Sequence, residues 1–201
     1  LRAQAENIGY PKTFSIYDQS DSTRLVGYCI RDLGLDPKRF TPRGVQARIS
    51  LWKNELLTPG KAKDRATGML ESKHADVYIE YQLRLERAGA MDFDDLLMRT
   101  VQLFKQHPDV LAMYQERFEH ILIDEYQDTN RTQYDLIKLL VTDGKEPQAY
   151  DDWSGRSVFV VGDADQSIYS FRAADFTILM GFQDDFGDQA PDDATRTMVK
   201  L

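Results

Sequence analysis

Hydrophobic residues follow two different patterns along this chain. In residues 18–90 they recur at helical spacing: Val45, Ile49 and Trp52, for example, fall on one face of a helix that Thr41-Pro42 would start. We therefore predict three helices: one at about 20–33, one that starts at 42 and is ended by Thr58-Pro59-Gly60, and one at about 69–88. A polar, basic loop is predicted at 61–68.

The rest of the chain alternates helical patterns with short apolar runs. Ile121–Ile123 and Val158–Val161 are typical of buried strands, and a helix is predicted between them at about 131–141. A strand–helix–strand order favours two parallel strands with a right-handed crossover. We therefore predict an α/β fold with a parallel sheet, preceded by a helical part that ends near Gly89-Ala90. The remaining predictions are a strand at 13–17, helices at 94–106 and 109–117, and loops at 143–157 and 183–195.

Acidic residues directly follow both predicted strands. Asp124 and Glu125 follow the first strand, and Asp163 follows the second. The carboxyl ends of parallel strands meet at one edge of a sheet, where acids can hold hydrated Mg²⁺ and orient a water beside a nucleotide phosphate. Asp124-Glu125 thus has the character of a Walker B element. Many strands end in solvated acids, so it is the following Gln127 and Asp128 that make the pattern specific.

Charge is distributed unevenly along the 201 residues, whose net charge is −8. Residues 1–90 carry 15 Lys/Arg and 11 Asp/Glu, whereas residues 91–201 carry 10 and 22. The basic part could face phosphates while the acidic part holds a cation, but ordinary surface charge explains the counts equally well. The single cysteine, Cys29, fits a reducing cytoplasm, and neither a membrane span nor a secretory signal is visible. Leu1 and the strand-like Met198–Leu201 suggest that both ends are cut from a longer chain.

Two longer motifs resemble those of a known helicase family. Residues 124–130, Asp-Glu-Tyr-Gln-Asp-Thr-Asn, are similar to motif II of the UvrD/PcrA/Rep family of superfamily 1 DNA helicases. Residues 161–169, Val-Gly-Asp-Ala-Asp-Gln-Ser-Ile-Tyr, are similar to motif III. Residues 92–97 resemble an element that precedes motif II, and segments between Ile16 and Leu56 resemble the helical 1B subdomain.

The resemblance covers nearly the whole chain and implies its fold and domains. The expected fold is α/β: a RecA-like, parallel-sheet portion of a motor domain, of the P-loop NTPase type, with an all-helical inserted subdomain. The implied domains are a piece of motor domain 1A at 1–17, the helical subdomain 1B at 18–90, and a motor domain 1A portion with motifs II and III at 91–201. Residues 142–157 look like an insertion relative to compact relatives.

The resemblance also implies residues that act on ATP and Mg²⁺. Asp124 would bind Mg²⁺, and Glu125 would activate the attacking water. Gln166 would sense the γ-phosphate and couple it to the DNA site. Gln127 is expected among the residues that bind the nucleotide.

Four further residues are expected to contact DNA. Tyr169, Phe171 and Arg172 would lie along the single strand, since aromatic faces stack on any base and arginine adds charge and planar stacking. Core packing is the alternative for the two rings. Lys53 would face duplex DNA from the basic 1B region, and a solvated helix face is the alternative there.

The 201 residues contain no phosphate-binding loop of the form G-x-x-x-x-G-K-[ST]. ATP and Mg²⁺ would therefore need the rest of a parent helicase, and the isolated chain is expected to be inactive. The sequence thus predicts part of an ATP-dependent 3′–5′ DNA helicase of repair or replication. It would act on single-stranded DNA and single/double-strand junctions in a bacterial-type cytoplasm, associated with the nucleoid. The alternatives are a DNA-binding module without hydrolysis and part of a recombination-type helicase–nuclease.

Overall fold

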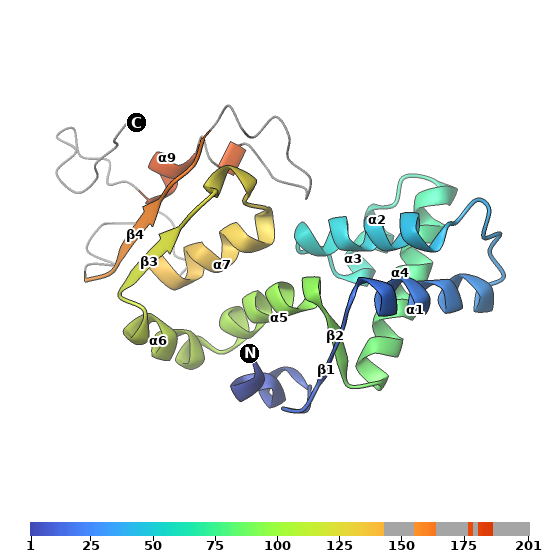
Figure 1. Ribbon diagram of the computed structural model, residues 1–201, viewed down its shortest axis with the longest axis horizontal. Helices are drawn as coiled ribbons and strands as arrows, with labels where there is room; N and C mark the ends of the chain where they lie inside the picture. Colours follow the sequence, from blue (N-terminus) through green and yellow to red (C-terminus); the bar gives the residue numbers. More distant parts are fainter. Residues whose placement is uncertain (143–154, 164–176, 179–180, 187–201) are drawn as a thin grey trace. The chain divides into compact units, whose positions relative to one another are not determined.

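The computed structural model describes residues 1–142, 155–163, 177–178 and 181–186 (Figure 1). The chain forms two compact units, residues 1–103 and 104–201. The first unit contains η1 (Arg2–Ile8), β1 (Ser15–Tyr17), α1 (Gln19–Asp32), α2 (Pro42–Asn54), α3 (Pro59–Arg65), α4 (Met69–Arg87), β2 (Ala90–Asp92) and most of α5 (Phe93–Gln106). The second contains α6 (Pro108–Arg117), β3 (His120–Ile123), η2 (Tyr126–Asp128), α7 (Arg131–Thr142), β4 (Ser157–Val160) and α9 (Phe182–Phe186). Within the described residues, no helix combines the length and the apolar character needed to cross a membrane.

Strands β1 and β2 pair in parallel although four helices separate them in the sequence (Figure 1). Ser15 lies opposite Ala90, and Tyr17 lies opposite Asp92. The helices α1 to α4 are therefore an insertion between two neighbouring strands. The sequence did not predict β2, because a three-residue strand that is buried throughout shows no periodicity of its own.

Side-chain caps explain where the inserted helices begin. Asp18 and Asp21 form a capping box before α1. Thr41 accepts a hydrogen bond from the backbone N–H three residues ahead, and proline follows it at the start of α2. Thr58 repeats this arrangement at the start of α3. The predicted loop at 61–68 is therefore wrong for 61–65, because Thr58-Pro59 starts a new helix as well as following the end of α2, whereas 66–68 do lie between helices.

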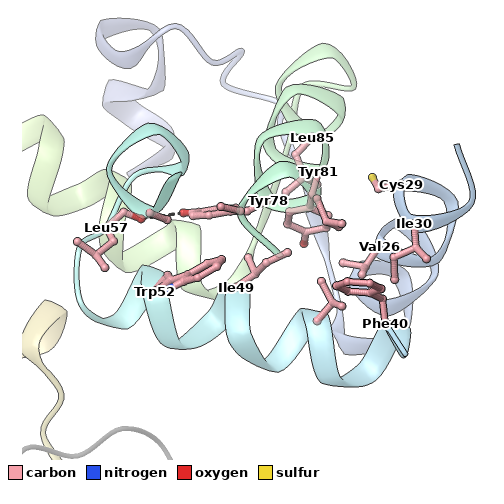
Figure 2. Packing of buried hydrophobic residues seen from close by; sticks show 14 of the residues in the cluster. Val26, Cys29, Ile30, Phe40, Ile49, Trp52, Leu57, Tyr78, Tyr81 and Leu85 are labelled. Atoms are coloured by element: carbon pink, nitrogen blue, oxygen red, sulfur yellow. Dashed lines mark hydrogen bonds between the residues drawn. The ribbon is translucent and has the colours of Figure 1, made fainter. Parts of the chain in front are cut away.

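The inserted helices share an apolar core, to which α1, α2 and α4 each contribute one face (Figure 2). Trp52 stacks on Tyr78 with ring centroids 5.9 Å apart. The Tyr78 hydroxyl donates a hydrogen bond to the carbonyl oxygen of Leu57 at 3.1 Å, so its polar end is satisfied. Each large side chain buried here contributes roughly 1.5–3 kcal/mol. Other buried members of this core are Val26, Cys29, Ile30, Phe40, Val45, Ile49, Tyr81 and Leu85.

Strands β3 and β4 of the second unit also pair in parallel, as the sequence predicted, with Leu122 opposite Phe159. Ile121, Ile123 and Val158 pack against a cluster formed by Ile178 and by residues of η2, α7 and α9. Leu122 and Phe159 belong to the alternate, exposed positions of the two strands. The regular alternation therefore directs one face of this strand pair toward the core of the second unit.

Two predicted loops lie only partly within the residues that the structure describes. The loop predicted at 183–195 is wrong for 183–186, which belong to helix α9. Its remainder lies outside the described residues. The loop predicted at 143–157 also lies mostly outside them, and Ser157 already belongs to strand β4.

Candidate active site at the carboxyl end of strand β3

Two acidic residues follow strand β3 at its carboxyl end. Asp124 and Glu125 are both exposed, and Asp124 Oδ1 accepts a hydrogen bond from the Glu125 N–H at 2.9 Å. Glu125 has a φ of 52°, in the left-handed region that residues other than glycine seldom adopt. Such a backbone costs about 1–3 kcal/mol and persists where surrounding contacts hold it, often at functional sites. The chain thus turns sharply after Asp124 and leaves two adjacent carboxylates accessible to solvent.

Hydrogen bonds hold the ends of β3 and β4 together beyond the paired residues. The Val161 N–H donates to the Ile123 carbonyl oxygen at 2.8 Å, and the Tyr126 N–H donates to the Val161 carbonyl oxygen at 2.9 Å. The Asp163 N–H donates to Gln127 Oε1 at 3.1 Å. The residues that follow the two strands therefore meet at the same edge of the sheet, as expected for parallel strands.

Buried side chains support the turn that carries the acids. Tyr126 is buried with its ring edge-on to Phe182, at 5.4 Å between centroids. Burial, with a smaller effect from Asp185, raises the pKa of the Tyr126 phenol, which therefore stays neutral. Asn130 and Gln133 exchange two hydrogen bonds of 3.0 Å, a capping box that starts α7. The turn is thus anchored at both ends.

The acid pair has the chemistry of a magnesium site. Mg²⁺ is usually held by one or two carboxylates, and water and substrate phosphates complete its coordination. Asp124 and Glu125 supply oxygen ligands of this kind, and the Glu125 N–H orients one of the carboxylates. In the part of the chain that the structure describes, no group of three or more His, Cys, Asp and Glu side chains could enclose a metal ion. The residues present fit a cation that is shared with a phosphate ligand.

Comparison with known proteins assigns the chain to a family. The family model of the UvrD/REP helicase N-terminal domain matches residues 1–187. The chain belongs to this family. Over 186 residues it is 40% identical to the ATP-dependent DNA helicase PcrA of Bacillus subtilis (strain 168), and 41% identical to the proteins of the same name from Staphylococcus aureus (strain Mu50) and Leuconostoc citreum. These alignments cover 92% of this chain and 24%, 24% and 23% of the relatives, so the chain spans about a quarter of their length.

The predicted nucleotide-site residues of this UvrD-family chain fall into two groups. Asp124, Glu125 and Gln127 lie together on the turn after β3. Gln127 is buried, and its side-chain oxygen binds a backbone N–H of the same unit. Gln166 lies outside the described residues, so its place beside the acids stays a prediction. The predicted DNA contacts Tyr169, Phe171 and Arg172 also lie outside the described residues.

Lys53 does not face solvent, which corrects the expectation that it contacts DNA. Its side chain is fully buried, with Nζ 2.7 Å from Asp92 Oδ2 and 3.0 Å from Asp95 Oδ1. Burial alone lowers the pKa of Lys53, but Asp95 and Asp92 outweigh this effect and raise the pKa above its usual value. Lys53 is therefore a charged counter-ion inside the first unit, because its side of α2 faces β2 and α5.

The two acids that bind Lys53 also organise the start of α5. Asp92 Oδ1 accepts the Asp95 N–H at 2.8 Å, and the Tyr81 hydroxyl donates to Asp92 Oδ2 at 2.8 Å. Burial favours the protonated form of Asp92, but Lys53 outweighs it and lowers the pKa of that carboxyl. Burial raises the pKa of Asp95. No pattern in the sequence indicated this ion pair, since Lys53 lies 39 residues from Asp92.

Proposed function

We propose that this chain carries the ATP-hydrolysing acid pair of a DNA helicase that moves 3′ to 5′ on single-stranded DNA and unwinds duplexes in repair or replication. Membership of the UvrD/REP family supports this, as do the relatives named ATP-dependent DNA helicases. The observation that best supports this proposal is the exposed pair Asp124 and Glu125 at the carboxyl end of β3. This pair lies at the same edge of the sheet as the residues that follow β4.

The same proposal assigns domains. Residues 1–17 and 91–201 would belong to a RecA-like motor domain 1A, and residues 18–90 to the helical subdomain 1B. The parallel pairing of β1 with β2 supports this division, because helices inserted between adjacent strands leave their pairing intact. The compact units divide elsewhere, within α5, at residues 103 and 104.

Each acid has a proposed role in hydrolysis. Asp124 would hold Mg²⁺, which when bound neutralises charge on the ATP phosphates. Glu125 would accept the proton of the attacking water, a task that suits an exposed carboxylate next to the metal ligand. Gln166 would contact the γ-phosphate, and it follows Asp163 by only three residues in the sequence. Tyr169, Phe171 and Arg172 would bind single-stranded DNA, including the single-stranded side of a junction.

The proposal requires a phosphate-binding loop from outside these 201 residues. Such a loop supplies backbone amides and a lysine that stabilise the phosphates as charge develops. Losing one comparable group costs on the order of 10²–10³ in rate. The isolated chain should therefore show no ATP turnover, whereas the full-length gene product that contains it should hydrolyse ATP in the presence of DNA.

Steady-state ATP turnover by the full-length gene product, with and without single-stranded DNA, tests the proposal. Glu125→Gln should lower kcat by on the order of 10²–10⁴ because it removes the general base. Glu119→Gln is the matched control, since Glu119 is an exposed acid just before β3. No turnover by the full-length protein, or normal turnover by Glu125→Gln, would refute the assignment. Turnover by the isolated chain that Glu125→Gln abolishes would refute the need for an outside loop.

A further inference from the structure

Gln127 joins the turn after β3 to the chain after β4 through its side chain. The residue is only 5% exposed, and its Oε1 accepts the Asp163 N–H at 3.1 Å. An N–H donor requires an acceptor, so the amide oxygen, not the amide nitrogen, must face Asp163. The acceptor atom of Gln127 is therefore already engaged by the protein's own backbone.

Gly162 lies so close to Gln127 that a side chain at this position would crowd it. A Cβ at this position would lie 3.0 Å from Gln127 Oε1, 3.3 Å from the Gln127 backbone nitrogen and 3.5 Å from Tyr126 Cβ. Gly162 is not among the glycines with positive φ. The absence of a Cβ, rather than the conformational freedom of glycine, therefore suits glycine to this site.

We propose that Gln127 is a positioning residue for ATP hydrolysis. By accepting the Asp163 N–H, its side chain seats Gly162 and Asp163 against the turn that carries Asp124 and Glu125. This inference rests on the proposed function, and it gives Gln127 a role that acts through Asp163 rather than through direct contact with the nucleotide.

Amide hydrogen exchange in the 201-residue chain tests the contact without any activity. Gln127→Leu removes the acceptor and should speed exchange of the Asp163 amide by about tenfold or more, as expected when a local hydrogen bond is lost. Gln127→Glu keeps an acceptor oxygen and should leave this amide protected. Gln115→Leu is the matched control, because Gln115 is a buried glutamine that donates to the Leu139 carbonyl oxygen elsewhere in the same unit. Unchanged exchange at Asp163 in Gln127→Leu would refute the proposal.

Kinetics of the full-length gene product separate positioning from nucleotide binding. Gln127→Leu should lower kcat by about tenfold or more while KM for ATP changes by less than about threefold, and Gln127→Glu should recover part of kcat. A rise in KM at unchanged kcat would instead identify Gln127 as a nucleotide ligand and overturn the proposal.

A double-mutant cycle tests the close approach of Gly162. Gly162→Ala should lower kcat, and Gln127→Ala removes the oxygen that the new Cβ would meet at 3.0 Å. The double variant should therefore lose less than the product of the two single effects, by about threefold or more. Independent, multiplicative effects would show that the two residues do not act as one unit. If the wild-type protein does not turn over ATP, the proposed function fails, and the exchange experiment still decides whether Gln127 positions Asp163.

Discussion

Replacing Lys53 by methionine tests the buried charges of the first unit. Methionine has a similar length and no charge, so Asp92 and Asp95 would lose their shared counter-ion while the packing is largely kept. The side chains of Lys53, Asp92 and Asp95 are 0%, 6% and 1% exposed, so water cannot replace the lost partner. The folded variant must then protonate an acid or tolerate an uncompensated charge.

The expected loss is large compared with the stability of a domain. Removing one partner of a buried ion pair costs about 3–5 kcal/mol, out of a total that is typically about 5–15 kcal/mol. Two neighbours reduce the loss: the Tyr81 hydroxyl still donates to Asp92, and Arg99 Nε lies 3.8 Å from Asp95 Oδ1. We therefore expect a loss of about 3 kcal/mol, near the lower end of this range.

The loss should also depend on pH. In the variant, Lys53 no longer opposes the effect of burial, which holds the pKa of each acid above its value in the unfolded state. The stability of the variant therefore falls as pH rises through the folded-state pKa. In the wild type, burial raises the pKa of Asp95 as well, but Lys53 opposes this rise, and the pKa of Asp92 is below its ordinary value. Its contribution is therefore complete above that ordinary value and is lost only as pH falls through the folded pKa. The difference between wild type and Lys53→Met should thus be larger at about pH 8 than at about pH 5.

Urea unfolding followed by tryptophan fluorescence measures this loss. Trp52 is buried and stacks on Tyr78, and a Trp153→Phe background makes it the only tryptophan. Lys63→Met is the matched control, because Lys63 is partly exposed and its pair with Asp76 should contribute at most about 1 kcal/mol. Adding Asp95→Asn to Lys53→Met should recover part of the stability. A loss no greater than that of the control, or a greater loss at low pH, would refute the reasoning.

Two further predictions concern the DNA site and the single cysteine. Tyr169→Ala and Phe171→Ala should each weaken single-strand binding by the full-length gene product by about 1–3 kcal/mol in fluorescence anisotropy at two salt concentrations; unchanged affinity in both would make the rings core residues. Cys29 is buried, and burial raises the pKa of its thiol to about 11. A thiol reagent at about pH 8 should therefore modify it only after urea unfolds the first unit, and rapid labelling of the native chain would contradict its placement.

Several elements could be predicted from the sequence because their signals are local. Thr41-Pro42 marks the start of α2. The hydrogen bond to the threonine side chain and the fixed backbone angle of the proline ring both act within one turn of the helix. The apolar runs of β3 and β4, each followed by acids, are enough to locate both strands and their shared edge. The same local signal at Thr58-Pro59 was misinterpreted as only the end of a helix, although it also starts α3.

Only the tertiary structure decided the features that depend on distant residues. Strand β2 exists because β1 pairs with it across the whole helical insertion. Lysine is usually a surface residue, but the ion pairs with Asp92 and Asp95 make Lys53 a buried ion. Gln127 belongs to a recognisable motif, yet its contact with Asp163 depends on β4, which lies a whole helix further along the chain. Caps and periodicity act between close neighbours in sequence, whereas strand pairing and charge burial depend on which remote segments meet when the chain packs.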